Sequence, residues 1–423
     1  MNDGLISQGS GTGAVAGAES TLAPPFVERR AVLARAAEIQ ERLHRLQRTL
    51  AEQAIEAALI VQSADLFYYT GTIQQSYLVV PAQGEVTLFT RKSAERARHE
   101  TPLPVTPLPS LRMLPDLVRE RYGRVPRRLG LELDVLPVNT WRRLEALFDV
   151  DESVDIGPWL LAQRAVKSAF EIERIVAAGK VTLATMERIP EFMGEGVSEV
   201  ELAGRIEAVA RALGHQGVVR MRGFNEEMFY GQLLTGVSAT VPSYLDTPLA
   251  GTGLSPAVAQ GVSFKPLQRG EPFIFDFVSV IDGYMADFTR IFSLGPLPVQ
   301  LRRAYEVALR VEQAVVEAAR PGVTCRALYE RALAVADAEG LRANFMGYGE
   351  GQVKFIGHGV GIELDELPVI APNDRVLEEG MVFALEPKFV LPGLGAIGVE
   401  NTWAVTASGL ELLTDASEEL RVL

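Results

Sequence analysis

The sequence of 423 residues has one cysteine, four histidines and no long apolar run. A single thiol, Cys325, excludes an intrachain disulfide, which is typical of a reducing compartment, so we expect a cytoplasmic protein. No stretch approaches the ~20 apolar residues that a membrane-spanning helix needs. Residues 1–26 also lack the basic start and apolar stretch of a secretory signal. We therefore expect neither a membrane span nor a leader.

Positive charge is scarce as well. The chain has 41 Lys and Arg against 54 Asp and Glu, which leaves a net charge of −13. Nucleic acids are bound through basic surfaces, and so are anionic membranes. We therefore expect no nucleic-acid partner and no membrane partner.

The patterns that are present divide the chain in two. Residues 1–26 are rich in Gly, Ser and Ala and predict a flexible tail. Residues 27–160 predict an α/β domain, with a helix over 27–54 and strands at 57–61, 76–81, 85–91 and 127–133. Residues 161–423 predict a second domain, which opens with a helix capped by Ser168 and Glu171.

The second domain contains a degenerate repeat. Gly196-Val197-Ser198 and Gly322-Val323-Thr324 each begin a helix, and a strand-like segment follows each helix, at 218–224 and 352–359. A pair of acid-bearing strands then follows in both cases. Two similar halves around one cleft would place a site at their junction. The helix after Thr324 predicts that Cys325 is a packed thiol.

The first half carries two acids in apolar strands. Asp276 and Asp287 are 11 residues apart, and Asp282-Gly283 between them predicts a hairpin turn. In a hairpin with an even-length loop, an odd separation places both side chains on one face, opposite or diagonal to each other.

The second half carries another such pair. Glu386 and Glu400 are 14 residues apart, and a hairpin with an odd-length loop around Pro392-Gly393 places them on one face. Buried carboxylates are unfavourable unless cations neutralise them. The nearest basic residues, Arg290 and Lys388, are too few for four acids, so we expect bound divalent metal ions. His358, between Gly357 and Gly359, is the candidate fifth ligand.

These motifs resemble the creatinase/aminopeptidase P/prolidase superfamily, peptidase family M24. The spans DFVSVIDGYMADFTR, GHGVG, LEP and VEN are similar to its metal motifs in order and spacing, and RAVKSAFEIE (164–173) resembles the opening of its catalytic domain. The resemblance implies an α/β (α+β) protein, in which a creatinase-like N-terminal domain precedes a pita-bread domain with pseudo-twofold halves. It also implies a homodimer.

The resemblance further implies a dinuclear-metal hydrolase similar to Xaa-Pro aminopeptidases and dipeptidases. Two divalent ions, Mn²⁺ or Co²⁺ first and Zn²⁺ or Fe²⁺ as alternatives, would be held by five ligands. A hydroxide that bridges the ions would attack the amide bond of a peptide or small amide substrate. Glu386 would also handle the proton of the nucleophile. The ligands are Asp276, Asp287, His358, Glu386 and Glu400.

The chain departs from the family pattern outside the metal ligands. Asp365 stands where family peptidases carry a histidine, and the loop 243–261 has no histidine at all. Gly398 stands where many Xaa-Pro enzymes carry an arginine. Asp365 is predicted to be a substituted catalytic acid or to bind a cationic part of a substrate. The residues predicted to bind substrate in place of the missing donors are Arg220, Arg222 and Tyr230.

Two alternative functions remain open at this point. The altered residues around the metal ligands are compatible with a metallohydrolase of a non-peptide small molecule. A catalytically inactive pita-bread binding module is the third hypothesis, although such modules usually lose metal ligands, and all five are retained here.

Overall fold

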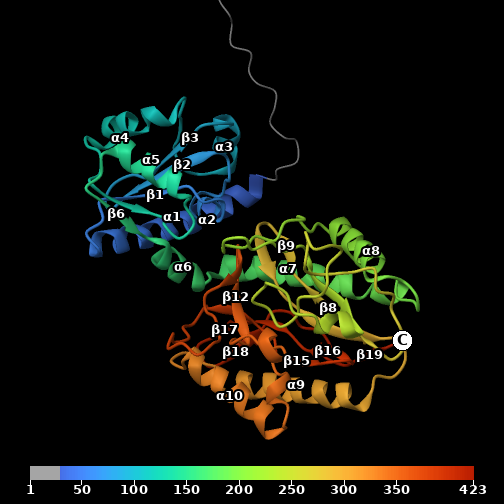
Figure 1. Cartoon of the computed structure of the whole chain (residues 1–423). Coiled ribbons are helices and arrows are strands. Elements are labelled where there is room, and N and C mark those ends of the chain that lie inside the picture. The colour runs from blue at the N-terminus through green and yellow to red at the C-terminus, as the bar shows by residue number, and fades with distance from the viewer. Residues whose placement is uncertain (1–28) are drawn as a thin grey trace, which may run out of the picture.

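The computed structural model describes residues 29–423, with side chains described from residue 36 onward. The predicted tail, residues 1–26, lies outside the described residues. Within the described chain, α6 (Gly157–Ala165) connects a smaller N-terminal domain to a larger second domain (Figure 1). The chain therefore has the predicted α/β class, with an N-terminal domain followed by a mixed catalytic domain.

The N-terminal domain is built on a six-stranded sheet in the order β4-β3-β2-β1-β5-β6. The strands are β1 (Ala57–Ile60), β2 (Ser76–Pro81), β3 (Thr87–Thr90), β4 (Val105–Pro107), β5 (Arg128–Leu131) and β6 (Glu152–Asp155). The helices are α1 (Arg29–Glu52), α2 (Ser63–Thr70), α3 (Ala94–Glu100), α4 (Leu114–Tyr122) and α5 (Val138–Phe148). The predicted strands at 57–61, 76–81, 85–91 and 127–133 are confirmed, as is the opening helix over its described part.

Both faces of this sheet are covered by helices. Successive residues of a strand point to opposite faces, and here both sets are buried: Leu59 packs in the cluster that contains Leu144 of α5, whereas Ile60 packs in the cluster that contains Leu43 and Leu46 of α1. The central strands therefore form continuous apolar runs, which is why AALIV is recognisable in the sequence.

The second domain contains two larger sheets and two hairpins. One sheet has the order β19-β11-β8-β7 and the other β13-β12-β14-β17-β18, while β9 pairs with β10 and β15 with β16. The strands of the first half are β7 (Gly231–Thr235), β8 (Pro272–Phe277), β9 (Ser279–Ile281), β10 (Tyr284–Ala286) and β11 (Thr289–Ser293). Those that follow are β12 (Gly357–Val360), β13 (Leu364–Glu366), β14 (Val382–Leu385), β15 (Lys388–Leu391), β16 (Gly395–Gly398), β17 (Asn401–Val405), β18 (Leu410–Leu412) and β19 (Arg421–Val422).

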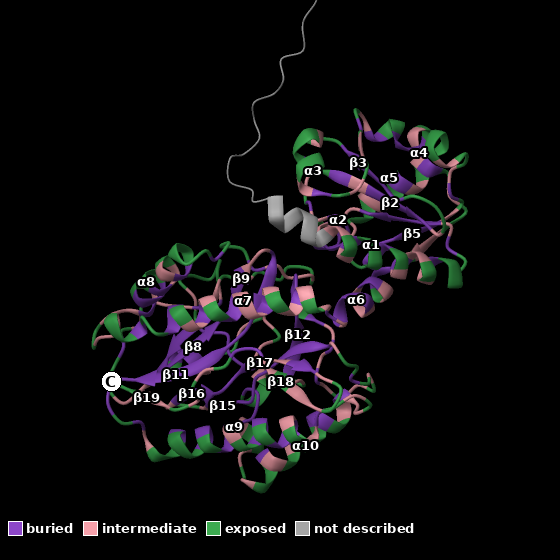
Figure 2. Ribbon diagram, turned by 180° about the vertical axis from the view of Figure 1, so that it is seen from behind, coloured by how far each residue is buried: buried purple, intermediate pink, exposed green. Residues whose placement is uncertain are grey.

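Helices enclose these sheets on two sides. Figure 2 shows the strands buried at the centre, with α7 and α8 on one side and α9 and α10 on the other, each exposing its outer face. The helices are α7 (Ala169–Met186), α8 (Glu199–Ala212), α9 (Val299–Ala318) and α10 (Cys325–Ala338). The 3-10 turns are η1 (Leu111–Met113), η2 (Ile189–Glu191), η3 (Gly236–Thr240), η4 (Arg342–Asn344) and η5 (Gly349–Gly351). Cys325 is buried in the core between α9 and α10, as predicted.

The predicted repeat is visible in the backbone hydrogen bonds that begin α8 and α10. Ser198 and Thr324 cap the two helices, and each forms an isolated bridge, to Pro266 and Val376 respectively. The same sets of bonds flank both bridges: the N–H groups of residues 196 and 199 donate to the carbonyls of 267 and 265, and those of 322 and 325 donate to the carbonyls of 377 and 375. The two halves of the second domain therefore share the same local backbone arrangement at the start of α8 and of α10.

Two sequence predictions about local structure are wrong. The segment 218–224 forms no strand, because its backbone follows an irregular path and Arg222 is drawn into contacts with the N-terminal domain. The spacing from Ser168 predicts a helix through Met193 that Pro190 bends or ends; the helix instead ends at Met186, and Pro190 lies in the short turn η2. The capping box of Ser168 and Glu171 itself is confirmed.

A buried ion network joins the two domains. Arg164 lies 2.8 Å from both Asp65 and Glu363 and 2.5 Å from Glu366, and these four side chains are essentially inaccessible to solvent. Lys167 also contacts Glu366, at 3.0 Å. Burial would raise the pKa of Glu366, but the charges of Arg164 and Lys167 outweigh it and lower the pKa to about 2. Through Asp65, the network holds α2 of the N-terminal domain against the segment that follows His358.

None of the helices in the described part of the chain combines the length and apolarity needed to cross a bilayer.

Replacing Arg164 by Met is expected to destabilise the protein by about 3–5 kcal/mol, because it leaves three buried carboxylates without their shared cation. The midpoint of urea unfolding, followed by circular dichroism, measures this loss. The matched control is Arg188→Met, which removes an exposed pair with Glu191 and should change stability by less than about 1 kcal/mol. Equal effects of the two substitutions would contradict a stabilising role for the network.

The same network predicts an acid dependence. The folded pKa of Glu366, about 2, lies below its ordinary value of 4.5. Its contribution is therefore fully present above pH 4.5 and is lost as the pH falls from there toward 2. Unfolding midpoints measured between pH 6 and pH 3 should fall more steeply for the wild type than for the Arg164→Met variant.

Candidate metal centre

In the first pair of acids, Asp276 lies on β8 and Asp287 lies between β10 and β11. Thr289 is directly opposite Asp276 in the antiparallel register, so Asp287 lies diagonally across from Asp276. The turn Asp282-Gly283 joins β9 to β10, and both residues have left-handed backbone conformations, with φ of 50° and 83°. The predicted hairpin and the shared face of the two aspartates are confirmed.

The second pair lies in a longer hairpin. Leu385 pairs with Asn401 at one end and Lys388 pairs with Gly398 at the other, so Glu386 and Glu400 are cross-strand neighbours between these pairs. The loop between Leu391 and Gly395 has three residues, which is the odd length that was predicted. Both glutamates therefore face the same side.

An isolated bridge brings the two hairpins together. The backbones of Thr289 and Glu400 pair, and the Thr289 hydroxyl donates a hydrogen bond to Glu400 Oε2 at 2.7 Å. The hydroxyl of Thr402 accepts from the Asp287 N–H at 3.1 Å and donates to the Asp287 carbonyl at 2.8 Å. Because the hairpins interlock along this line, all four carboxylates converge on one point.

His358 of β12 completes the cluster. Its Nε2 lies 3.7 Å from Asp287 Oδ2, 3.8 Å from Glu386 Oε1 and 3.9 Å from Glu400 Oε1. On the other side of the ring, Nδ1 lies 3.2 Å from Asp365 Oδ1. Because Nδ1 faces an acceptor, we assign the ring hydrogen to Nδ1, which leaves Nε2 free to bind a metal.

The glycines around His358 are required by close backbone contacts. A Cβ on Gly357 would lie 2.3 Å from the carbonyl oxygen of Ala384, and one on Gly359 would lie 2.4 Å from that of Leu367. Only glycine allows the neighbouring strands to approach the histidine this closely.

Burial makes the cluster hold protons when no metal ion is present. Burial raises the pKa of Asp276 to about 6. Burial, together with the charge of Glu400, raises the pKa of Asp287 well above its usual range. Burial lowers the pKa of His358, but the neighbouring carboxylates, Asp365 first, outweigh it and raise that pKa to about 9. A divalent cation would favour the ionised carboxylates and the neutral imidazole instead.

One group of donor atoms fits a divalent ion. Glu400 Oε1 is fully buried and has no hydrogen-bond partner, and it lies with ligand atoms of Asp287 and His358 in a cluster spanning no more than 4.8 Å. Glu386 Oε1 faces the same imidazole nitrogen. Carboxylate oxygens with one imidazole suit Mn²⁺, Co²⁺, Fe²⁺ or Zn²⁺. These four residues therefore could hold one such ion.

A lysine occupies the other side of the cluster. The ammonium of Lys388 lies 2.9 Å from Asp276 Oδ2, 2.8 Å from Glu386 Oε2 and 2.9 Å from Glu400 Oε2. Sequence reasoning counted Lys388 only as a nearby charge. The spacing from Glu386 could have indicated this contact. Lys388 follows Glu386 by two residues in the same hairpin, and residues two apart in extended backbone share a face. The other basic residue considered, Arg290, turns away and donates to the carbonyls of residues 289, 400, 416 and 417.

The predicted outer residues have different outcomes. Asp365 contacts the metal-binding candidate His358 directly, and its backbone has a left-handed φ of 62°. Arg222 instead contacts Asp65 at 2.9 Å and Asp134 at 2.6 Å, both in the N-terminal domain. Its side chain is committed to the interdomain network, so the prediction that it binds substrate loses its support.

The other two substrate-binding candidates also lie away from the cluster. The ring centroid of Tyr230 lies 4.3 Å from that of His215 and 5.7 Å from that of Phe277, and the ring is partly buried against the core of the first half. Neither Tyr230 nor Arg220 is among the residues that line the cavity over the metal centre. His215 itself is structural, because its ring nitrogens bond to the backbone of Val278 and Gly217.

The cavity over the carboxylates opens into a larger one of about 220 Å³. Its acidic lining consists of Glu226, Glu227, Asp246 and Asp365. Its apolar lining consists of Met221, Met228, Leu245, Phe355 and Val369. In the sequence, the loop 243–261 is notable only for its missing histidine. In the structure, this loop contributes Asp246 and Thr247 to the lining of the cavity.

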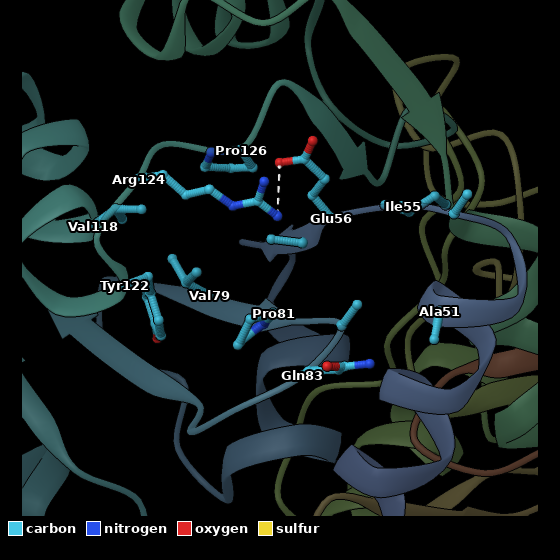
Figure 3. Close-up of a pocket in the computed structure, with 13 residues that line it drawn as sticks. Ala51, Ile55, Glu56, Val79, Pro81, Gln83, Val118, Tyr122, Arg124 and Pro126 are labelled. Atoms are coloured by element: carbon cyan, nitrogen blue, oxygen red, sulfur yellow. Dashed lines mark ion pairs between the residues drawn. The ribbon is translucent and has the colours of Figure 1, made fainter.

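Another cavity, of about 560 Å³, lies in the N-terminal domain (Figure 3). Side chains of α1, β2 and α4 line it, and Arg124 pairs with Glu56 at 3.5 Å across its rim. Glu56 is its only lining acid, and no histidine or cysteine lines it. This cavity lacks a group of residues suited to catalysis, so the carboxylate cluster is the candidate functional site.

Comparison with known proteins agrees with this geometry. Residues 173–407 match the model of metallopeptidase family M24, and residues 42–166 match that of the creatinase/prolidase N-terminal domain. The chain is 28% identical over 387 residues to an Xaa-Pro dipeptidase of Pyrococcus furiosus, covering 90% of this chain and 100% of that protein. It is 27% identical over 399 residues to one of Lactobacillus delbrueckii, covering 90% and 98%.

Solved structures share the fold. The prolidase from Pyrococcus horikoshii has a TM-score of 0.76 at 23% identity and covers 90% of this chain and 99% of its own. The Xaa-Pro dipeptidase from Bacillus anthracis has a TM-score of 0.77 at 23% identity and covers 91% and 100%. The likeness extends over both domains.

The contact between Asp365 and His358 predicts a loss of metal affinity when the acceptor is removed. Asp365→Gly should weaken Mn²⁺ binding about tenfold, because the Nδ1–H then loses its charged acceptor and keeps only the more distant Gly359 carbonyl, at 3.3 Å. Asp365→Asn keeps an acceptor and should retain most of the affinity, and both residues tolerate a φ of 62°. Isothermal titration of the metal-free proteins measures the affinities. Equal affinities of the Gly and Asn variants would contradict an orienting role.

Proposed function

The chain belongs to metallopeptidase family M24 and is a metal-dependent hydrolase, and we propose that it cleaves Xaa-Pro dipeptides or a closely related dipeptide-like amide. Four buried carboxylates and one imidazole converge from both halves of the second domain, and this convergence is the observation that supports the proposal most directly. The relatives named Xaa-Pro dipeptidase, which match along nearly their whole length, supply the substrate class.

A divalent ion bound at this site would supply Lewis-acid chemistry, which assists the attack of water on an amide carbonyl. Asp287, His358 and Glu400 hold it in our proposal, together with Glu386. Glu386 Oε1 is the oxygen of that carboxylate which does not contact Lys388, so it is the atom that we propose accepts a proton from the attacking water.

Asp365 takes a different part in this proposal from the one that the sequence favoured. Its carboxylate lies 3.2 Å from Nδ1 of His358, so we infer that it orients the imidazole and is a positioning residue. A carboxylate in that contact accepts a hydrogen bond and is not available to donate one to a substrate carbonyl.

The lining of the cavity supports a substrate with positive charge. Four carboxylates line the cavity of about 220 Å³, and none of its lining residues within the described chain is a lysine or an arginine. A free amino terminus or a cationic first residue would be attracted to this lining, whereas an acidic residue would be repelled. The apolar wall formed by Met228, Leu245 and Phe355 would accept the ring of a proline.

The predicted homodimer and cytoplasmic location stay predictions. The number of metal ions is a separate question, because Lys388 contacts three of the candidate ligands. Retention of the complete donor set disfavours an inactive binding module, and a non-peptide amide is the alternative substrate class that a hydrolysis panel would reveal.

Hydrolysis of Xaa-Pro dipeptides in the presence of Mn²⁺ or Co²⁺ tests the proposal. Release of free proline is expected with the wild type. Asp287→Asn should lower kcat/KM at least about 100-fold, because it replaces a charged carboxylate ligand of the proposed metal ion, beside His358, with a neutral amide. Asp282→Asn, in the turn of the same hairpin but outside the metal centre, is the matched control and should be active. No turnover by folded, metal-loaded wild type on the whole panel would rule out the proposed substrate.

The acidic cavity predicts a charge preference. Dipeptides with Lys or Arg before the proline should have higher kcat/KM than those with Glu, and the ratio should shrink as salt is added. Asp246→Asn should reduce this ratio several-fold, whereas Asp374→Asn, which lies outside the cavity, should not. A preference for Glu, or a ratio unaffected by either variant, would contradict the predicted role of the cavity.

A further inference from the structure

Lys388 occupies a position that a metal ion would need. It begins β15, two residues after Glu386, and its side chain is buried. Its ammonium lies within 2.9 Å of one oxygen each from Asp276, Glu386 and Glu400. These three acids come from both halves of the domain, so the lysine bridges the halves as a metal ion would. An ammonium and a divalent ion cannot both occupy the position at which these three oxygens converge.

The lysine has little room to move aside. Gly398 lies opposite it in the hairpin, and a Cβ on Gly398 would lie 2.6 Å from Lys388 Cγ. The absence of a side chain at Gly398 therefore creates the space that the stem of the lysine fills. An ammonium turned away from these three carboxylates would give up its three close acidic partners and leave them without their shared cation, which is unfavourable in a buried site.

The two oxygens of each glutamate face different sides of the cluster. Oε2 of Glu386 and Oε2 of Glu400 contact the ammonium, whereas Oε1 of each faces Nε2 of His358. The orphaned, buried Glu400 Oε1 lies on the histidine side. The cluster thus has one position already filled by a protein cation and one set of donors without a cation.

Charge supports the same division. Four ionised carboxylates carry a charge of −4. One ammonium and one divalent ion bring the net charge of the cluster to −1. Two divalent ions beside the ammonium would leave a net positive charge in a buried site, with cations in close repulsive contact.

We propose that Lys388 takes the place of one metal ion, so that the chain binds one divalent ion, through Asp287, His358, Glu386 and Glu400, and not two. The inference rests on the metal-binding part of the proposed function and is independent of the peptide substrate.

The number of bound ions tests this proposal directly. The full-length protein is stripped with a chelator, saturated with Mn²⁺, freed of excess ion by gel filtration and analysed by inductively coupled plasma mass spectrometry. The wild type is expected to contain one ion per chain. Lys388→Ala frees the three oxygens and clears space, so it is expected to contain two.

Lys354→Ala is the matched control, because Lys354 is exposed and lies near the site in sequence. It should contain one ion, like the wild type. Two ions per wild-type chain would overturn the proposal, and so would zero, or a Lys388→Ala variant that folds and still contains one. If Lys388→Ala does not fold, as judged by circular dichroism, the count on the wild type alone decides.

The count also separates this proposal from the proposed function. One ion per chain without hydrolysis of Xaa-Pro dipeptides would leave the role of Lys388 standing and overturn the substrate class. Two ions with efficient hydrolysis would do the reverse.

Discussion

The four carboxylates of the metal centre repel one another and lose their hydration when they are buried, so the second domain depends on the cations that neutralise them. All four acids are buried, and three of them have apolar neighbours on both sides in the chain, so little solvent compensates their charge. The pKa of Asp287 rises accordingly when no metal ion is bound. Lys388 supplies one positive charge from within the chain, and the donors around His358 are arranged to receive another.

The two halves of the second domain bring the acids together through the same order of elements. Each half begins with a capped helix, α8 or α10, and continues into an acid-bearing hairpin. The bridge between Thr289 and Glu400 then joins the hairpins, so that the acids of one half complete the site of the other. The N-terminal domain is tied to the rim of the same site, because Glu363 and Glu366 of the loop after His358 pair with Arg164. The ion network and the metal centre thus lie at opposite ends of one short segment.

Much of this arrangement follows from local patterns in the sequence. The parity of the separations, 11 between Asp276 and Asp287 and 14 between Glu386 and Glu400, correctly predicted which side chains share a face, because strand periodicity is strict. The helix caps at Ser168, Ser198 and Thr324 were recognisable for the same local reason. These features depend only on residues close together in the chain.

The rest depends on contacts between distant residues. Arg222 was expected at the substrate, but its partner Asp65 is 157 residues away and belongs to the other domain. The segment 218–224 is strand-like in sequence, yet its backbone is irregular in the structure, and it meets β13 through a hydrogen bond from the Leu364 N–H to the Arg220 carbonyl. The sequence indicated that Lys388 is a nearby charge but not that it forms ion pairs with the acids. Its contact with Asp276 spans 112 residues and depends on how the two halves meet. Gly398 was seen only as a missing arginine, whereas in the structure it makes room for that lysine.

A crystal structure of the Mn²⁺-soaked protein, with anomalous differences recorded at the manganese edge, tests the central claim most directly. The account predicts a single anomalous peak beside Nε2 of His358 and Oε1 of Glu400, with the ammonium of Lys388 still in contact with Asp276. Two peaks about 3.5–4 Å apart, with Lys388 displaced from the carboxylates, would contradict it.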